Sequence, residues 1–86
     1  MAKIKIYTTM FCPYCDMAKE LLQSKGAAFE EIDVTTAPDI RAEMARRTGR
    51  TSVPQIWIGA THVGGCDDLH ALDGTGRLDE LLAANT

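Results

Sequence analysis

The sequence of 86 residues contains no long apolar run. A membrane-spanning helix needs about 20 consecutive, mostly apolar residues, and every apolar stretch of this chain is broken by polar residues well before that length. Residues 1–7 contain two lysines but no apolar segment of signal-peptide length. We therefore expect a cytoplasmic protein that does not bind a membrane.

Positive charge is also scarce. Nine Lys and Arg residues against twelve Asp and Glu residues give a formal net charge of -3. Proteins that bind phosphate backbones usually carry a basic surface, so nucleic acid is not an expected partner. The local cluster of Arg46, Arg47 and Arg50 is interpreted as the solvated C-terminal end of a helix, a place that favours cations.

Linkers and biased tracts are missing as well. No Pro/Gly-rich segment or internal repeat divides the chain. A chain this short has too few apolar side chains for two stable cores. The sequence therefore predicts a single domain over residues 1–86.

Cysteine is sparse, with three residues in the chain. A small secreted scaffold usually carries an even number of cysteines that connect distant segments. Here Cys12 and Cys15 are separated by only two residues, and Cys66 stands alone. This placement favours redox or metal chemistry in a reducing compartment over a structural disulfide framework.

Two predicted strands and the helix between them form the first part of the chain. Residues 3–7 and 28–34 alternate polar and apolar side chains, as half-buried strands do. Residues 14–25 carry apolar side chains at helical spacing until Gly26 stops the pattern. A βαβ unit of this length implies parallel strands with a right-handed crossover.

The second part of the chain adds two more strands and three more helices. A helix is predicted from Pro38, which suits a first helical turn, to the residue before Gly49. Two short strands separated by Gly59 and Ala60 form an antiparallel hairpin. The predicted segments are a helix at 38–48, strands at 55–58 and 61–63, and helices at 66–72 and 78–84. The fold class is therefore α/β, with a mixed four-stranded sheet flanked by helices.

The Cys12-Pro13-Tyr14-Cys15 segment carries the chemistry. Attack on a disulfide needs a thiolate, whereas a free cysteine with a pKa of about 8.5 is mostly protonated near neutral pH. Because Pro13 favours the first helical position, Cys12 falls at the N-cap, where free N–H groups and the helix dipole point at its sulfur. Cys15 lies one turn further along the same face. We assign Cys12 as the nucleophile and Cys15 as the resolving thiol.

A structural metal site is the alternative for the two cysteines. Such a site needs about four ligands, and only Cys66, His62 and His70 are available besides the pair. The two histidines have no cysteine or carboxylate at a spacing that indicates a shared site, so we predict them to be surface residues. Cys66 is interpreted as a partly buried residue at a helix start, and a redox role for it stays open.

Three motifs together carry a family resemblance: Cys-Pro-Tyr-Cys at residues 12–15, Thr-Ser-Val-Pro at 51–54 and Gly-Gly-Cys-Asp-Asp at 64–68. In this order and in so short a chain, they resemble the glutaredoxins of the dithiol type. The resemblance implies a thioredoxin fold, a monomer without a metal, and glutathione as the reductant. It also implies reduction of protein disulfides and glutathionylated proteins, a role in cell redox homeostasis, and electron donation to reductases.

The resemblance also assigns a glutathione site. Pro54 would be a cis proline, and Val53 would pair with the peptide as an added strand does. The γ-glutamyl end would bind the start of the helix after residue 65, with its ammonium group on Asp67. Arg41 is the candidate for the glycine carboxylate, and a solvated helix arginine is the alternative. The residues so assigned are Tyr14, Arg41, Ser52, Val53, Pro54, Gly65, Cys66 and Asp67.

One departure from the family concerns residues 8–11. Glutaredoxins commonly have a lysine shortly before the first cysteine, whereas this segment contains no cation and ends in Phe11. Cys12 therefore depends more on the helix terminus, and Phe11 adds apolar surface. Two other functions stay open: a module that holds an iron–sulfur cluster between two chains through Cys12 and glutathione, and a thioredoxin recycled by a reductase.

Overall fold

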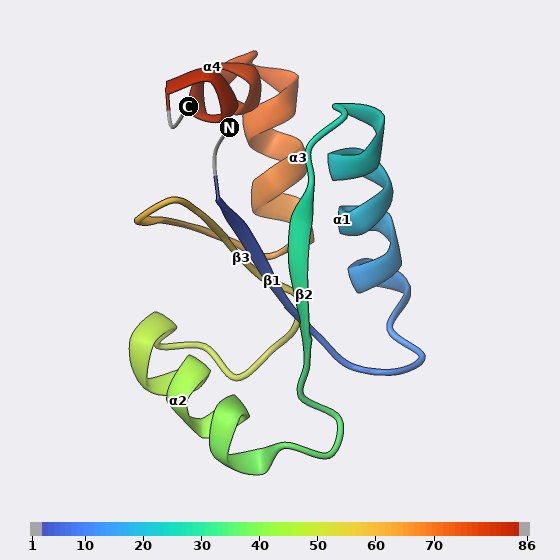
Figure 1. Ribbon diagram of the computed structural model, residues 1–86, viewed down its shortest axis with the longest axis vertical. Coiled ribbons are helices and arrows are strands. Elements are labelled where there is room, and N and C mark those ends of the chain that lie inside the picture. Colours follow the sequence, from blue (N-terminus) through green and yellow to red (C-terminus); the bar gives the residue numbers. More distant parts are fainter. Residues whose placement is uncertain (1–2, 85–86) are drawn as a thin grey trace.

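Four strands form one mixed sheet in the order β2-β1-β3-β4, with helices on both faces (Figure 1). The structure is a computed structural model that describes residues 3–84. The strands are β1 (Ile4–Thr8), β2 (Phe29–Asp33), β3 (Gln55–Ile58) and β4 (Thr61–Gly64). The helices are α1 (Pro13–Ser24), α2 (Pro38–Thr48), α3 (Cys66–Gly74) and α4 (Arg77–Ala84). This architecture confirms the predicted fold class.

The strand directions bring the predicted site together. β1 runs parallel to β2 and antiparallel to β3, while β3 and β4 form the predicted hairpin. Tyr7, near the carboxyl end of β1, is paired with Gln55 at the amino end of β3. The segment after β1, which carries Cys12, and the segment before β3, which carries Pro54, therefore meet at one edge of the sheet.

One face of the sheet packs against α1, α3 and α4. Side chains alternate along a strand, so Ile4 and Ile6 of β1 and Ile56 and Ile58 of β3 all point to this face. The helices contribute Ala18, Leu22, Leu69 and Leu78 to the same cluster. All eight side chains are buried. This core fixes the start of α1 and the start of α3 relative to each other.

The opposite face packs against α2, which Figure 1 shows on the other side of the sheet from α1 and α3. Its smaller cluster consists of Tyr7, Val34 and Met44, with Val53 and Trp57 packed against them. Gly49 ends α2 in the left-handed conformation, with φ of 73°, as a helix-terminating glycine does. The predicted limits of this helix are confirmed.

Several element limits differ from the prediction by one or two residues at an end. Thr8, expected in the turn after β1, is the last residue of that strand, because its carbonyl accepts the N–H of Val34 at 2.8 Å. α3 extends to Gly74, although a break was predicted from residue 73. The helix closes at Thr75, where the N–H groups of Thr75 and Gly76 donate to the carbonyls of Leu72 and Asp73. None of the helices within residues 3–84 combines the length and apolar character of a membrane span.

Candidate functional site

Cys12 is the N-cap of α1, as predicted. Its backbone is extended, with φ of −112° and ψ of 100°, and Pro13 occupies the first turn of the helix. The backbone N–H of Cys15 donates to Sγ of Cys12 at 3.2 Å. This is one of the N–H groups that a helix leaves unpaired at its start. The sulfur of Cys12 therefore faces a donor and the positive end of the helix dipole.

Cys15 lies behind Cys12 on the buried face of α1. Its side chain is 1% exposed, whereas Cys12 is half-buried, and both cysteines are free thiols. Burial, followed by a hydrogen bond between the Cys15 and Cys12 side chains, raises the pKa of the Cys15 thiol to about 12. Cys15 is thus protonated and shielded at neutral pH, while Cys12 is reachable from solvent.

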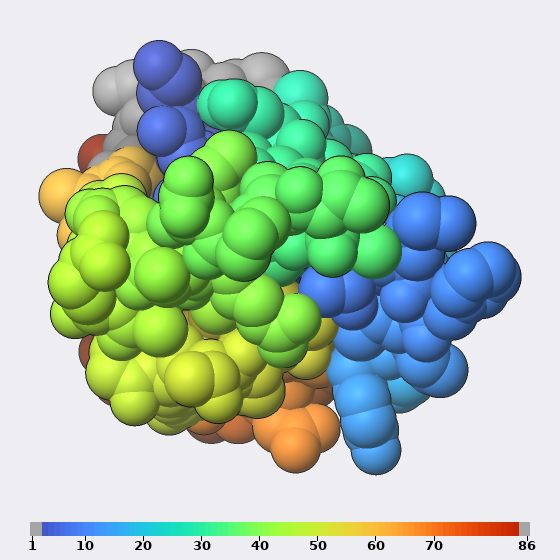
Figure 2. Space-filling model, turned by 90° about the horizontal axis from the view of Figure 1, so that it is seen from below, coloured from blue at the N-terminus to red at the C-terminus, as the bar shows by residue number. Residues whose placement is uncertain are grey.

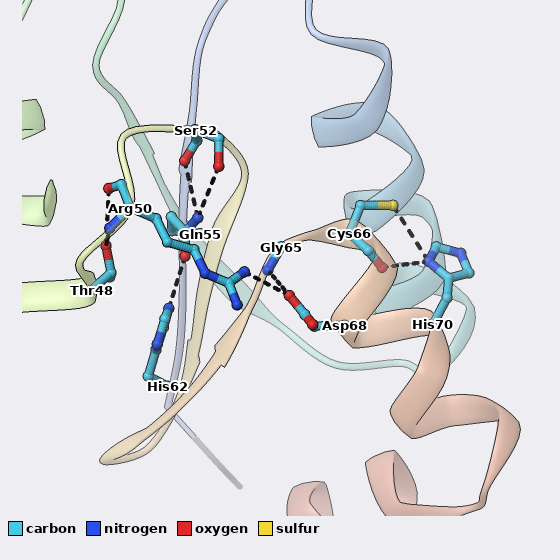
Figure 3. A network of polar contacts seen from close by, with 9 residues as sticks. All are labelled: Thr48, Arg50, Ser52, Gln55, His62, Gly65, Cys66, Asp68 and His70. Carbon is cyan, nitrogen blue, oxygen red and sulfur yellow. Dashed lines mark hydrogen bonds and ion pairs between the residues drawn. The ribbon is translucent and has the colours of Figure 1, made fainter.

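The segment before β3 places a carbonyl and a proline beside Cys12. The Val53–Pro54 peptide bond is cis, as the family resemblance implied. The carbonyl oxygen of Val53 lies 4.0 Å from Sγ of Cys12. Figure 3 shows how the buried Gln55 holds this segment: its Nε2 donates to the carbonyl of Ser52 at 3.1 Å, and its Oε1 lies 2.8 Å from Nε2 of His62.

The start of α3 forms the other wall of the site. The N–H of Gly65 donates to Oδ2 of Asp68 at 2.9 Å, and Nη1 of Arg50 lies 2.8 Å from the same oxygen. The hydrogen bond from Gly65, followed by that from Arg50, lowers the pKa of the Asp68 carboxyl. Asp68 is therefore the acidic residue that caps this helix, which leaves the side chain of Asp67 exposed to solvent.

Gly64 allows this wall to form. Its φ of +116° lies where side chains are rarely found, and a β-carbon there would clash with the carboxylate of Asp68. The chain therefore needs glycine at the end of β4 in order to turn into α3 with the Asp68 cap in place.

These walls enclose a groove of about 200 Å³. Its lining combines the first turn of α1, the segment before β3 and the start of α3. The lining residues are Tyr14, Arg50, Ser52, Val53, Pro54, Gly65, Cys66, Asp67 and Asp68. Figure 2 shows this face of the molecule, with the blue start of α1, the yellow segment before β3 and the orange start of α3 around its lower edge.

Seven of the eight residues that the sequence assigned to glutathione line this groove. Arg41 does not: its Nη2 donates to the carbonyl of Thr51 at 3.0 Å, beside the groove-lining Ser52. A larger hollow of about 610 Å³ lies between β4, α3 and α4, but none of the three cysteines lines it.

Sequence reasoning missed Arg50 and Asp68 as groove residues. Arg50 was grouped with its neighbours as a solvated cluster, but the structure separates the three arginines. Arg46 pairs with Glu43, Arg47 lies over the ring of Trp57, and Arg50 pairs with Asp68. The only available signal was the position of Arg50, two residues before Ser52.

The two histidines differ from the prediction in their contacts. His70 is exposed, but its Nδ1 lies 3.4 Å from Sγ of Cys66 and 2.9 Å from the carbonyl oxygen of the same residue. His62 is half-buried, and burial lowers the pKa of its ring. The i, i+4 spacing of Cys66 and His70 on a helix could have indicated their contact. Burial raises the pKa of the Cys66 thiol.

Residues 3–84 contain no cluster of metal-ligating side chains. No three His, Cys, Asp or Glu side chains of these residues are grouped so that they could hold an ion. The contact between Cys66 and His70 brings together only two side chains that could bind a metal ion.

Comparison with known proteins gives consistent matches. The profile of the glutaredoxin family matches residues 4–63. The chain is 62% identical over 84 residues to a glutaredoxin of Pseudomonas aeruginosa, covering 98% of this chain and 100% of that protein.

Two solved structures are similar as well. The solution structure of a glutaredoxin from Brucella melitensis has a TM-score of 0.86 at 57% identity, and the match covers 95% of this chain and 89% of that one. The crystal structure of the buckwheat glutaredoxin–glutathione complex has a TM-score of 0.90 at 29% identity, and the match covers 96% of this chain and 78% of that one.

The sheet, its helices and the dithiol at the start of α1 define a thiol–disulfide oxidoreductase with a thioredoxin fold. The chain belongs to the glutaredoxin family and is a glutathione-dependent thiol oxidoreductase. The family resemblance of its three motifs is thereby confirmed.

Proposed function

We propose that Cys12 is the nucleophile of this oxidoreductase and Cys15 its resolving thiol. The observation that carries the assignment is the 3.2 Å contact between the N–H of Cys15 and Sγ of Cys12, together with the burial of the Cys15 side chain. A donor aimed at the sulfur stabilises a thiolate and therefore favours attack. The buried thiol cannot meet a substrate first.

With a glutathionylated protein, the thiolate of Cys12 attacks the sulfur of the glutathionyl group. The substrate disulfide breaks, a Cys12–glutathione disulfide forms, and the protein leaves as a thiolate that takes up a proton. A second glutathione thiolate then attacks the glutathionyl sulfur. Oxidised glutathione leaves, and the Cys12 thiolate is restored.

With a protein disulfide, Cys12 forms a mixed disulfide with one substrate sulfur, and the other leaves as a thiol. The thiolate of Cys15 then attacks Sγ of Cys12, which releases the reduced protein and leaves a Cys12–Cys15 disulfide. Two glutathione molecules reduce that disulfide and become oxidised glutathione. Two electrons thus pass from glutathione to the substrate in each cycle.

Glutathione is proposed to bind in the groove beside Cys12. The backbone of Val53 would pair with the extended tripeptide, and the N–H groups at the start of α3 would hold its γ-glutamyl carboxylate. Asp67, exposed at the groove, would pair with the ammonium group. The structural likeness to the buckwheat glutaredoxin–glutathione complex supports this placement.

Two arginines are available for the remaining carboxylate of glutathione. Arg41 is proposed as its partner, since the hydrogen bond to the carbonyl of Thr51 fixes its guanidinium next to Ser52. Arg50 lines the groove itself, but Asp68 already occupies its Nη1. We assign Arg50 to positioning the start of α3.

The wider role proposed for the protein is redox homeostasis in the cytoplasm, as a monomer that needs no metal and supplies electrons to reductases. Its protein substrates are disulfide-containing or glutathionylated proteins. An iron–sulfur cluster shared by two chains is the alternative of a different class. Visible absorbance and metal analysis of anaerobically purified protein distinguish the two, because a coloured, iron-containing dimer would support the alternative.

The test compares how fast the oxidised protein is reduced by glutathione and by a thioredoxin reductase. We expect faster reduction by glutathione, and a preference for the reductase would overturn the assignment. In a glutathione-coupled assay, Cys12→Ser should abolish turnover, while the control Ala60→Asn, in the exposed turn between β3 and β4, should retain it. Full activity of Cys12→Ser would show that another group is the nucleophile.

A further inference from the structure

Large exposed apolar side chains gather around Cys12. Four of the five that the structure exposes are Met10 at 56%, Phe11 at 95%, Tyr14 at 59% and Met17 at 47%. They belong to the loop before Cys12 and to the first turns of α1, and we call them the apolar patch. Figure 2 shows this blue segment projecting at the right of the face that contains the groove.

The loop holds Phe11 outward in a defined conformation. Phe11 has φ of +55°, and it is the non-glycine residue with a positive φ among residues 3–84. Such a conformation is uncommon for a bulky side chain. The neighbouring N–H of Met10 donates to Oγ1 of Thr35 at 2.8 Å, which fastens the loop to the segment after β2. Packing within the fold does not explain a phenylalanine that is 95% exposed.

The apolar patch is continuous with the groove. Tyr14 belongs to both, because it lines the groove and exposes more than half of its surface. Met17 follows three residues later in α1, which places it on the same side of the helix. Neither Met10, Phe11 nor Met17 lines the groove. A molecule attached to glutathione in the groove would therefore find the apolar patch next to it.

The charges of residues 8–11 and of α1 disfavour an acidic occupant of the apolar patch. Residues 8–11 contain no cation, and the single basic residue of α1 is Lys19. Its Nζ lies 3.1 Å from Glu31 and 3.7 Å from Asp16. An acidic segment would find no free positive charge here and would meet the exposed carboxylate of Asp16.

We propose that the apolar patch binds the residues that flank the reactive cysteine of a protein substrate. This inference rests on the proposed function, since it places the glutathionyl half of the substrate in the groove. The preferred substrates are then glutathionylated cysteines with apolar, non-acidic neighbours. Cys12 attacks the glutathionyl sulfur, the disulfide breaks, and the departing protein thiolate leaves across the apolar patch and takes up a proton.

Three substrates test the proposal. Two are synthetic peptides of equal length and net charge with one glutathionylated cysteine, flanked by Leu and Phe in one and by Ser and Gly in the other. The third is the mixed disulfide of glutathione with 2-mercaptoethanol, which has no flanking residues. The protein should reduce the apolar peptide with a kcat/KM about tenfold higher than that of the polar peptide, the scale expected for one partly buried aromatic contact.

Phe11→Asn is the decisive variant, because asparagine tolerates a positive φ and removes the ring. It should lose most of the preference for the apolar peptide and reduce the small mixed disulfide at the unchanged rate. Met17→Gln should lower the preference in the same direction. Ala60→Asn, in the exposed turn between β3 and β4, is the control and should retain the full preference.

The outcomes separate this inference from the proposed function. Equal rates for the two peptides, or a preference that Phe11→Asn and Met17→Gln both leave unchanged, would overturn docking on the apolar patch while the small mixed disulfide is still reduced. Failure to reduce the small mixed disulfide would instead overturn the proposed function. Circular dichroism of each variant shows that it is folded before its rates are compared.

Discussion

The backbone N–H of Cys15 donates to the sulfur of Cys12 at 3.2 Å, while the Cys15 side chain is buried behind it. The backbone of Cys15 thus stabilises the sulfur of Cys12, while burial shields the side chain of Cys15 from solvent. Burial comes first among the causes that raise the pKa of Cys15, followed by a hydrogen bond between the Cys15 and Cys12 side chains.

Replacing Cys15 separates the two activities. Cys15→Ser keeps the backbone N–H that faces Cys12 and removes the resolving sulfur. We expect it to retain reduction of glutathione mixed disulfides and to lose on the order of a hundredfold or more on protein disulfides, because an external thiol must replace an intramolecular one. Both rates can be measured with excess glutathione. Equal losses on the two substrates would contradict the assigned roles.

Alkylation should distinguish the three thiols. A thiol with a pKa of about 12 is ionised at roughly one part in 10⁴ at pH 8, and only the thiolate reacts. Burial also raises the pKa of Cys66. Iodoacetamide at pH 8 should therefore label Cys12 first and leave Cys15 and Cys66 largely unmodified until the protein is unfolded. Peptide mass spectrometry over time gives the order, and labelling of Cys15 at the pace of Cys12 would contradict it.

The free energy of unfolding should depend on pH through the carboxyl group of Asp68. Its folded pKa is lowered by Gly65 and Arg50, so it stabilises the fold above its unfolded pKa of about 3.9 and loses this effect as the pH falls through the folded pKa. Asp68→Asn should lower the free energy of unfolding by about 1 kcal/mol at pH 7, the usual value of a helix cap. The difference from the wild type should shrink near pH 3.

Urea unfolding across this pH range measures the effect of Asp68→Asn. Asp67→Asn is the matched control, because Asp67 adjoins Asp68 at the start of α3 but has no hydrogen bond or ion pair with the residues that the structure describes. A difference for Asp68→Asn that stays constant with pH would mean that its carboxylate charge does not support the cap.

Gly64→Ala should affect both stability and glutathione use. Its φ of +116° and the nearby Asp68 carboxylate leave no room for a β-carbon, so we expect a loss of about 2 kcal/mol or more in the free energy of unfolding. Because the start of α3 would shift, the KM for glutathione should also rise. Gly49→Ala is the control: its φ is +73°, with no atom within 4 Å of the added carbon.

The control should lose only about 1 kcal/mol, the cost of the left-handed conformation alone. It should leave the KM for glutathione unchanged, since Gly49 ends α2 and does not line the groove. Equal effects of the two substitutions would show that contact with Asp68 is unimportant.

Local signals in the sequence predicted much of this fold. Pro38 and Gly49 mark both ends of α2, and Pro13 places Cys12 at a helix start. These signals could be read from the sequence because each residue affects only the backbone next to it. The hairpin across Gly59 and Ala60 is confirmed for the same reason. Seven groove residues followed from the family motifs.

Contacts between distant segments could not be predicted. Arg50 and Asp68 are 18 residues apart, and their ion pair exists only because β3 and β4 bring the two segments together. The hydrogen bond of Gln55 with His62 likewise depends on the register of the hairpin. The length of α3 was missed because the helix closes through hydrogen bonds of Thr75 and Gly76 and so ends two residues beyond the predicted limit.

Trp57 provides a fluorescence probe that takes no part in the thiol chemistry. It is the single tryptophan of the chain, and it packs on the α2 face of the sheet with the guanidinium of Arg47 4.6 Å from its ring centroid. Its emission therefore reports whether the packing of α2 on the sheet is intact, whereas alkylation of Cys12 reports whether the nucleophilic thiol is reactive. Recorded on one sample, the two signals distinguish a variant in which α2 no longer packs on the sheet from one that has lost only the reactive thiol of Cys12.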